Sequence, residues 1–302
     1  MRKPAYAGFF LRKERKMDFK TELMSFRLSH PLKEMDVDGH LFHYLLCGQG
    51  ESPLTLVYFV GGTGNPLGWY RHVLSMEGKY RVLILDYPMG IDQMEPMTEW
   101  IEKLLNRLEI SEAVFIGASF GGYIAQLMAR RCPEKTKALA LYATTALTEE
   151  GIADLKKQYR YVGRLLFMME HMPYGLLKAL LMKPSFRRLI PKGDSSQTEY
   201  LKGFTQWIYD DYTKEKDLHM TYLMADIVNL KPVKQEDFSD LRGKVLLVLP
   251  KADQAFTPKM QKDLQDLFEN PTVETLEGGH LATLFRAEEI ARRTDRFLTN
   301  CI

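Results

Sequence analysis

Cysteine is scarce in this 302-residue sequence, and the three that occur, Cys47, Cys132 and Cys301, are scattered and lack the spacing of metal ligands. We expect them to be buried or unreactive thiols of a reducing compartment, with no metal site. An excess of charge of one sign is also missing, because 41 basic residues stand against 39 acidic ones and leave a net charge of +2. This balance gives no general attraction to nucleic acid, so no nucleic-acid partner is expected.

Long apolar runs are absent too. None approaches the roughly 20 residues that span a bilayer, so stable membrane insertion is not expected. The short run at residues 8–11 is followed at once by charges and does not make a secretion signal. A basic cluster near the start could contact an anionic membrane, but a solvated, frayed leader is favoured; it consists of Arg2, Lys3, Arg12, Lys13, Arg15, Lys16 and Lys20. We expect a cytoplasmic protein, either a monomer or a homodimer.

What the sequence does contain is an alternation of strand and helix patterns. Short runs rich in β-branched and aromatic residues predict strands at 40–47, 54–60, 81–86, 113–116, 138–142, 244–249 and 272–276. Helical periods lie between them, at 67–76, 97–108, 120–131, 258–268 and 287–298, with Thr98 as the expected N-cap of the second. This order is typical of an α/β protein with a mostly parallel, doubly wound central sheet.

The alternation stops between residues 147 and 241, where the patterns are helical. We therefore predict a leader and first-strand region at 1–39, a core formed by 40–146 and 242–302, and an inserted all-helical lid at 147–241. Apolar side chains of the lid would form either an acyl-binding roof or simply the lid's own core; they are Phe167, Met168, Met169, Met172, Tyr174, Leu176, Leu177, Leu180, Leu181 and Met182.

The clearest chemical motif is Gly117-Ala118-Ser119-Phe120-Gly121-Gly122, at a predicted turn from strand to helix. In such a turn the side chain of Ser119 points away from the sheet, and the neighbouring glycines let the backbone pack past it. The helix that follows adds free N–H groups and positive potential where an oxyanion would form. Ser119 is therefore the predicted nucleophile.

A serine hydroxyl needs a base, and the base needs an acid that orients it. His280 follows the strand at 272–276 through two glycines, and Asp253 follows the strand at 244–249, so both belong to the carboxyl edge of the sheet. We assign them as base and acid, with the lid carboxylate Asp226 as the alternative acid. The other histidines are expected at the surface or in packing roles: His30, His40, His43, His72, His171 and His219.

The chain resembles the α/β-hydrolase fold superfamily with a helical cap, over roughly residues 40–300. The resemblance rests on the order serine, aspartate, histidine and on Gly61-Gly62-Thr63-Gly64 after the predicted strand at 54–60. In that family the loop usually begins His-Gly, whereas Gly61 stands here. The resemblance implies that the N–H groups of Thr63 and Phe120 form the oxyanion hole. Gly62, Met168 and Met172 are assigned to substrate contact.

The resemblance also excludes some subfamilies. Epoxide hydrolases and dehalogenases carry Asp where this chain has Ser119, and residues 87–92 replace the Arg-Gly-x-Gly-x-Ser turn of many capped members. No phosphate-binding loop or dinucleotide motif is present, so no cofactor is expected. We predict a serine hydrolase that cleaves an ester, lactone or thioester of a small to medium apolar substrate. Acyl transfer, carbon–carbon bond hydrolysis and a ligand receptor with a slow triad remain as alternatives.

Overall fold

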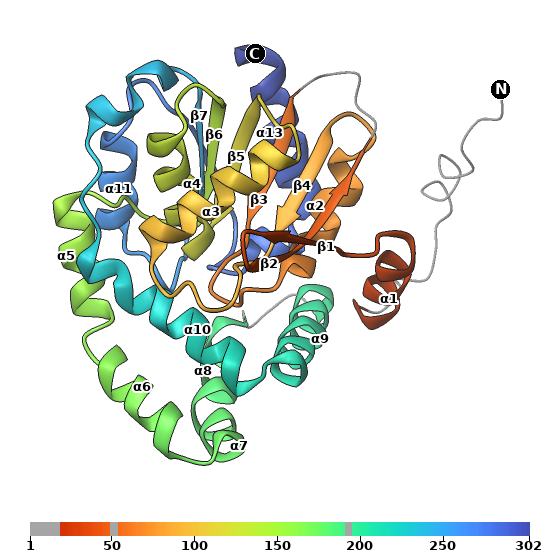
Figure 1. The fold of residues 1–302 in the computed structure, drawn as a ribbon, viewed down its shortest axis with the longest axis vertical. Coiled ribbons are helices and arrows are strands. Elements are labelled where there is room, and N and C mark those ends of the chain that lie inside the picture. Colours follow the sequence, from red (N-terminus) through yellow and green to blue (C-terminus); the bar gives the residue numbers. More distant parts are fainter. Residues whose placement is uncertain (1–18, 49–53, 191–194) are drawn as a thin grey trace.

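The computed structural model describes residues 19–48, 54–190 and 195–302 (Figure 1). The basic leader lies outside these residues, apart from Lys20. Eight strands form one sheet in the order β1-β2-β4-β3-β5-β6-β7-β8. Their bounds are β1 Lys33–Val37, β2 His40–Cys47, β3 Thr55–Phe59, β4 Arg81–Leu85, β5 Ala113–Ala118, β6 Thr136–Tyr142, β7 Val245–Pro250 and β8 Thr272–Leu276.

The predicted doubly wound architecture is confirmed. All strand pairs are parallel except β1 with β2 and β2 with β4. Helices α2 Tyr70–Met76 and α13 Ala287–Cys301 pack together behind the sheet, while α3 Met94–Arg107 and α4 Phe120–Arg131 cover its other face (Figure 1). Because both faces are covered, strands β3 and β7 are buried along their whole length, which explains their continuous apolar sequences.

The stretch before residue 40 is more structured than the sequence indicated. Helix α1 Phe19–Ser29 buries Phe19, Leu23 and Phe26 and packs against lid helix α9 Ser195–Asp211. Strand β1 then pairs with β2. The expectation of a frayed leader is therefore wrong for its described end, residues 19–20, because three aromatic and aliphatic side chains on one face of α1 gain burial by docking.

The start of α3 also differs from the prediction. The helix begins at Met94 rather than at 97, and Thr98 lies inside it with its hydroxyl donating to Glu95 O. Pro96 did not delay the start, because the first turn of a helix does not use the missing N–H of a proline. The backbone N–H of Met94 is instead satisfied by the carboxylate of Asp226, at 2.8 Å.

The inserted helical lid is confirmed between β6 and β7. It consists of α5 Glu149–Gln158, α6 Val162–His171, α7 Tyr174–Leu177, the π-helix η2 Lys178–Met182, α8 Lys183–Leu189, α9, α10 Lys214–Ala225, and the 3₁₀ helices η3 Asp226–Asn229 and η4 Gln235–Leu241. Within the described ranges, no helix has the length and apolar character needed to cross a membrane.

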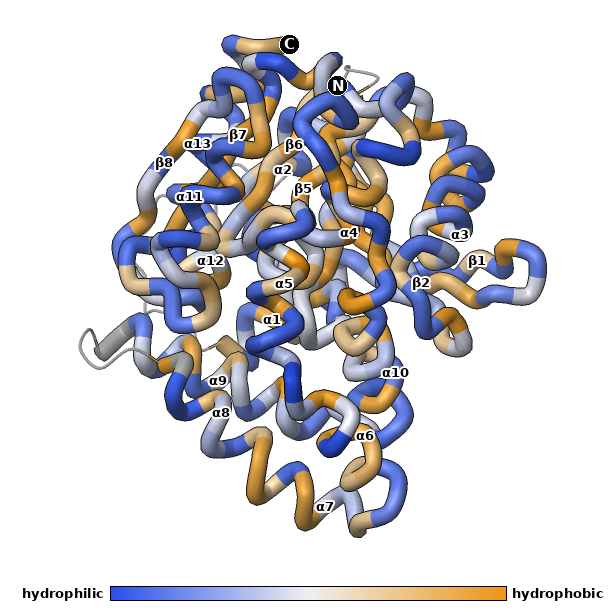
Figure 2. The backbone as a smooth tube through the Cα atoms, turned by 90° about the vertical axis from the view of Figure 1, so that its left-hand side faces the viewer, coloured by the Kyte–Doolittle hydropathy of each residue, from blue (hydrophilic) through white to orange (hydrophobic). Residues whose placement is uncertain are grey.

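The lid's apolar segment does not pack as one core. Met169 and Leu177 are buried, but other members lie 41–61% exposed at the end of the lid that projects from the body (Figures 1 and 2); these are Phe167, Leu176, Leu180 and Leu181. The expectation that this set forms lid core is therefore wrong for these four side chains.

A buried histidine connects helix α2 to the segment that follows His280. His72 of α2 is 1% exposed and lies against the rings of Trp69 and Tyr142, with its Nε2 2.9 Å from Thr283 O. Since a carbonyl only accepts, Nε2 carries the proton of the neutral ring. Burial lowers the pKa of His72 from 6.5 to about 4, although the hydrogen bond to Thr283 opposes this. Thr283 belongs to α12 Ala282–Phe285, which follows His280 directly.

We expect this histidine to make the fold sensitive to acid. In the unfolded state His72 becomes protonated below pH 6.5, whereas in the folded state it stays neutral down to about pH 4. The stability that depends on neutral His72 is therefore complete above pH 6.5 and is lost as the pH falls. The loss amounts to about 3 kcal/mol of unfolding free energy. Urea unfolding at pH 7 and pH 4.5 measures it, and His72→Gln, which keeps an N–H donor but does not titrate, should lose less stability over that range. Equal losses in both proteins would contradict this.

Candidate active site

The loop between β5 and α4 holds Ser119 in a strained conformation. Its φ is 54° and its ψ is −123°, a backbone conformation that residues other than glycine rarely adopt. The backbone around it is fully engaged: Ser119 N donates to Tyr142 O at 3.1 Å, and Ser119 O accepts from Thr144 Oγ1 at 2.8 Å and Gly122 N at 2.9 Å. These bonds keep the side chain at the carboxyl edge of the sheet.

The glycines of the motif are required by close packing. A Cβ on Gly117 would lie 2.1 Å from Gly121 O, and one on Gly121 would lie 2.1 Å from Phe59 O. A Cβ on Gly122 would meet the side chain of Thr144 at 2.5 Å. The helix can therefore start against β5 and β3 only because these three positions lack side chains.

The structure brings Ser119, His280 and Asp253 together. His280 Nε2 lies 3.0 Å from Ser119 Oγ, and His280 Nδ1 lies 3.0 Å and 3.2 Å from the two carboxylate oxygens of Asp253. The side chain of Asp253 is fully enclosed and that of His280 is 11% exposed. A carboxylate can only accept at Nδ1, so Nε2 presents its lone pair to the serine hydroxyl.

Backbone groups hold the carboxylate of Asp253 in place. Asp253 Oδ1 accepts from the N–H groups of Ala255 at 2.7 Å and Phe256 at 3.1 Å, in the turn that precedes α11 Pro258–Asp266. The ring of Phe256 also lies edge-on to His280, with centroids 5.5 Å apart. The turn therefore fixes both the carboxylate and one side of the imidazole.

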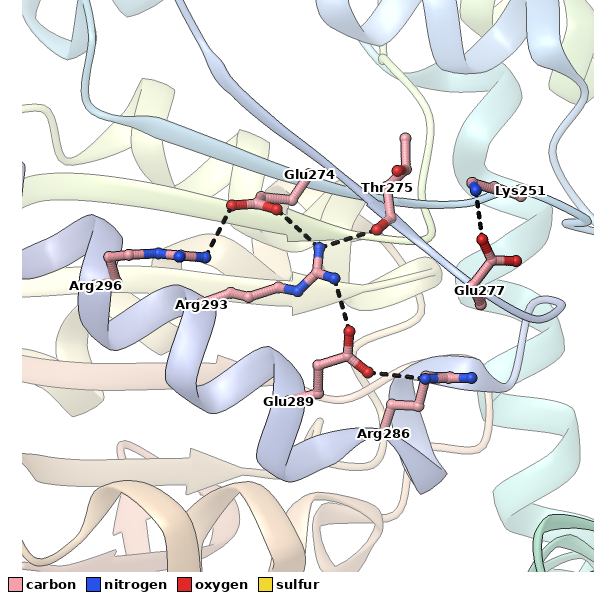
Figure 3. A network of polar contacts seen from close by, with 8 residues as sticks. All are labelled: Lys251, Glu274, Thr275, Glu277, Arg286, Glu289, Arg293 and Arg296. Atoms are coloured by element: carbon pink, nitrogen blue, oxygen red, sulfur yellow. Dashed lines mark hydrogen bonds and ion pairs between the residues drawn. The ribbon is translucent and has the colours of Figure 1, made fainter.

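The loops that carry Asp253 and His280 continue the pairing of β7 and β8. Lys251 N donates to Leu276 O at 2.9 Å and Ala252 N to Gly278 O at 3.2 Å. The side chains of Lys251 and Glu277 form an ion pair across the two loops (Figure 3). These contacts make the relative position of acid and base a property of the sheet rather than of two independent loops.

Gln254 is a residue of this site that the sequence analysis missed. Its Oε1 accepts from the backbone N–H of His280 at 2.9 Å. A Cβ on Gly279 would lie 2.4 Å from the Gln254 side chain, so glycine is needed there for the contact. The position of Gln254, next to the predicted acid, was the available signal.

Helix α13 anchors the edge strand from which the His280 loop departs. Arg293 donates to Glu274 of β8 at 2.8 Å and to Thr275 O at 2.9 Å, and its other nitrogen reaches Glu289 at 2.6 Å (Figure 3). Arg286 and Arg296 extend the same network at its two ends. Such partly exposed pairs act mainly as a network that fixes geometry.

The predicted oxyanion residues lie on two segments beside Ser119. Phe120 is the first residue of α4, where the backbone N–H has no partner within the helix. The loop 61–64 turns tightly, with Gly64 N donating to Gly61 O at 2.9 Å, and a Cβ on Gly61 would lie 3.9 Å from that of Ser119. Thr63 therefore belongs to a loop that borders Ser119.

The lid is attached to this same loop. Tyr212, after α9, donates its hydroxyl to Gly62 O at 2.9 Å, and Asn65 Nδ2 donates to Asp211 at 3.0 Å. From α10, Met220 Sδ lies 2.8 Å from the position of a Cβ on Gly64, and Met224 Sδ 3.8 Å from that on Gly62. These two methionines are apolar lid side chains that abut the loop, and the sequence analysis had not singled them out.

Met168 and Met172 occupy a different place. Both belong to α6 or its end, are half-buried, and are joined by the bond from Met172 N to Met168 O. Helix α6 packs against α10, and its neighbour Met169 accepts from Thr221 of α10 at 3.7 Å. These contacts do not test whether Met168 or Met172 touches a substrate, so that role stays a prediction. The methionines that contact the loop 61–64 belong to α10.

A cavity of about 1210 Å³ lies elsewhere, between α1, α8 and α9. Charged residues such as Arg27, Arg71 and Lys183 line it together with Tyr200 and Trp207, and its lining does not include the triad. Its size therefore says nothing about the substrate of Ser119.

Comparison with known proteins gives the family. A model for the alpha/beta hydrolase fold matches residues 36–287. The chain is 29% identical over 126 residues to the dihydrolipoyllysine-residue acetyltransferase component of the acetoin cleaving system of Pseudomonas putida, covering 39% of this chain and 34% of that protein. Human maspardin is 27% identical over 131 residues, 42% of each chain. The chain thus matches less than half the length of these curated relatives.

Solved structures agree in fold at low identity. A putative lipase from Acinetobacter baumannii has a TM-score of 0.72 at 18% identity, covering 95% of this chain and 98% of the other. An enol-lactonase from Burkholderia xenovorans gives 0.68 at 18% identity, covering 88% and 100%. A naproxen esterase from Bacillus subtilis gives 0.61 at 13% identity, covering 94% and 100%. With a family model matching most of its length and this sheet order, the chain belongs to the alpha/beta hydrolase fold family.

Proposed function

We propose that this protein is a serine hydrolase that cleaves an ester, lactone or thioester of a small to medium apolar substrate through an acyl-enzyme. The observation that carries the proposal is the chain of hydrogen bonds from Ser119 through His280 to Asp253. Such a chain activates a hydroxyl that is otherwise a weak nucleophile. Cofactors are not needed for this chemistry.

The chemistry follows from the direction of these bonds. Ser119 Oγ attacks the carbonyl carbon while its proton passes to His280 Nε2, and the carboxylate of Asp253 stabilises the imidazolium. The N–H groups of Thr63 and Phe120 receive the oxyanion, each typically contributing a few kcal/mol to transition-state stabilisation. His280 then protonates the leaving group, and a water activated by His280 releases the acid and restores Ser119.

The apolar substrate is inferred from the side chains over the loop. Met220 and Met224 are flexible and polarisable, which suits contact with an acyl chain of variable shape. The lid is fixed to the oxyanion loop through Tyr212, so its position bears on both binding and chemistry. The neighbouring structures described as a lipase, an enol-lactonase and an esterase all act on acyl–oxygen bonds by name, which is consistent with this class.

The first test concerns the nucleophile. On nitrophenyl butyrate we expect many turnovers per protein molecule, within the usual range of about 1–10³ per second for a well-matched ester. A fluorophosphonate should label Ser119, and Ser119→Ala should reduce turnover by several orders of magnitude with the melting temperature little changed. A burst of one product equivalent that then stops, with the acyl group retained, would favour a receptor with a slow triad over an enzyme.

The second test separates the two possible acids. Asp253→Asn should lower kcat by up to about 10⁴-fold, because the amide cannot hold His280 in the tautomer that accepts the serine proton. Asp226→Asn is the matched control: its carboxylate is engaged by Met94 N at 2.8 Å and Asn229 Nδ2 at 3.0 Å. We expect that variant to lose stability while keeping kcat in its folded fraction. The reverse pattern of kcat losses would assign the acid to Asp226.

The third test locates the acyl-binding surface. Met224→Trp should shift the preference in a series of nitrophenyl esters toward shorter acyl chains, because each methylene excluded from an apolar pocket is worth about 1–3 kcal/mol. Met168→Trp makes the same replacement on α6, one helix further from the loop, and should leave the chain-length profile closer to that of the unmodified protein. A shift with Met168→Trp alone would place the substrate against α6 instead.

A further inference from the structure

Three donor side chains of different chemistry converge far from the triad. His30 lies just after α1, Cys47 ends β2 and Glu77 follows α2. One ligand atom from each, an imidazole nitrogen, the thiol sulfur and a carboxylate oxygen, lie within 4.8 Å of one another. All three residues are partly exposed, with the His30 and Glu77 side chains at 13% and 26%, so a small solute can reach them.

The hydrogen bonds around His30 determine which nitrogen faces the cluster. Ser29 Oγ lies 3.1 Å from Phe26 O and 3.2 Å from Ser25 O, at the end of α1. His30 Nδ1 lies 2.8 Å from the same hydroxyl oxygen, so Nδ1 faces Ser29 and Nε2 faces the cluster. With a cation on Nε2, Nδ1–H can donate to Ser29 Oγ, and metal-bound histidines are usually oriented by such a bond from the second ring nitrogen to an oxygen.

The other nitrogen then meets an acceptor. His30 Nε2 lies 2.8 Å from Glu77 Oε2. Without a cation, a hydrogen on Nε2 makes this contact, and a divalent cation bound by the nitrogen and the carboxylate oxygen would take the place of that hydrogen. The ring of Phe26 stacks on His30 at 4.3 Å and limits its rotation, so the direction of Nε2 is fixed.

The thiol of Cys47 completes the set of donors. Its Sγ lies within 4.8 Å of the nitrogen and oxygen ligand atoms of His30 and Glu77. A cation bound there would take Cys47 as a thiolate, because a thiol loses its proton when it coordinates a metal.

We propose that His30, Cys47 and Glu77 form a binding site for a divalent transition-metal ion of the zinc type, with water as the fourth ligand. Nitrogen, sulfur and oxygen ligands together suit a borderline ion such as Zn²⁺ and do not suit Mg²⁺ or Ca²⁺, which take oxygen ligands. Zinc bonds are about 2.0–2.3 Å long, which places the donors of a tetrahedral site roughly 3.3–3.8 Å apart. His30 Nε2 and Glu77 Oε2, which lie 2.8 Å apart, therefore have to separate slightly to admit the ion.

Such an ion would join three elements that are distant in the chain. Helix α1 contacts the core through Glu22, which accepts from Tyr70 OH at 2.7 Å and Arg71 Nη2 at 2.6 Å, and contacts the lid through α9. His30 lies at the other end of this helix. A metal at His30, Cys47 and Glu77 would therefore fasten α1, and with it one side of the lid, to the sheet.

Cobalt titration tests the proposal directly on the full chain, because Co²⁺ substitutes for zinc and absorbs. We expect one equivalent to bind at neutral pH with a thiolate-to-cobalt charge-transfer band in the near ultraviolet, which zinc then displaces. Cys47→Ser should abolish the band, while Cys301→Ser, which removes another partly buried thiol, should leave it unchanged. Ser119→Ala should keep the band, so the result is independent of the proposed catalysis.

A second measurement, of the melting temperature with and without zinc, uses the unmodified protein and so does not depend on the folding of the variants. Zinc at about a hundred times its dissociation constant should raise the melting temperature of the unmodified protein by about 5 °C. Glu77→Gln and His30→Gln should reduce this shift. Absence of a charge-transfer band in the unmodified protein, its survival in Cys47→Ser, or its loss in Cys301→Ser would each overturn the proposal.

Discussion

The strained turn at Ser119 is the constraint on which the site depends. A serine at φ 54° costs of order 1–3 kcal/mol, and the fold keeps it because the surrounding backbone allows no other path. Three glycines let β5, α4 and β3 approach to distances that any Cβ would prevent, and the Thr144 hydroxyl and Tyr142 carbonyl hold the turn from the β6 side. The strain is thus distributed over the centre of the sheet, where it is least able to relax.

The side chains of His280 and Asp253 depend on the sheet in a different way. His280 and Asp253 are carried by loops that extend the pairing of β7 with β8, and α13 ties the edge strand down through Arg293. The turn before α11 supplies two backbone donors to Asp253, and Gln254 holds the backbone of His280. The imidazole is therefore oriented by the sheet and its loops.

The elements of the core could be predicted from the sequence because their signals are local. Buried parallel strands are continuous apolar runs, and the Ser119 turn has glycines at fixed offsets. The fold class, the lid and the three side chains now found within hydrogen-bond distance, Ser119, His280 and Asp253, could therefore be predicted. Helix α1 was missed because its burial depends on α9, which lies elsewhere in the sequence. The contacts of Met220, Met224 and Tyr212 were missed for the same reason. The convergence of His30, Cys47 and Glu77 has no spacing signal at all, since each comes from a different element.

The separation of Ser119 from His280 by 161 positions has a consequence for how the protein is made. During synthesis the strained turn, β5 and α4 leave the ribosome first, and then the whole lid must follow before β7 and β8 can join the sheet. Contacts of such long range form late, because the entropy of closing the intervening loop is lost before they add stability. The growing chain therefore presents Ser119 without its hydrogen bond to His280 until the lid, β7 and β8 have all been synthesised.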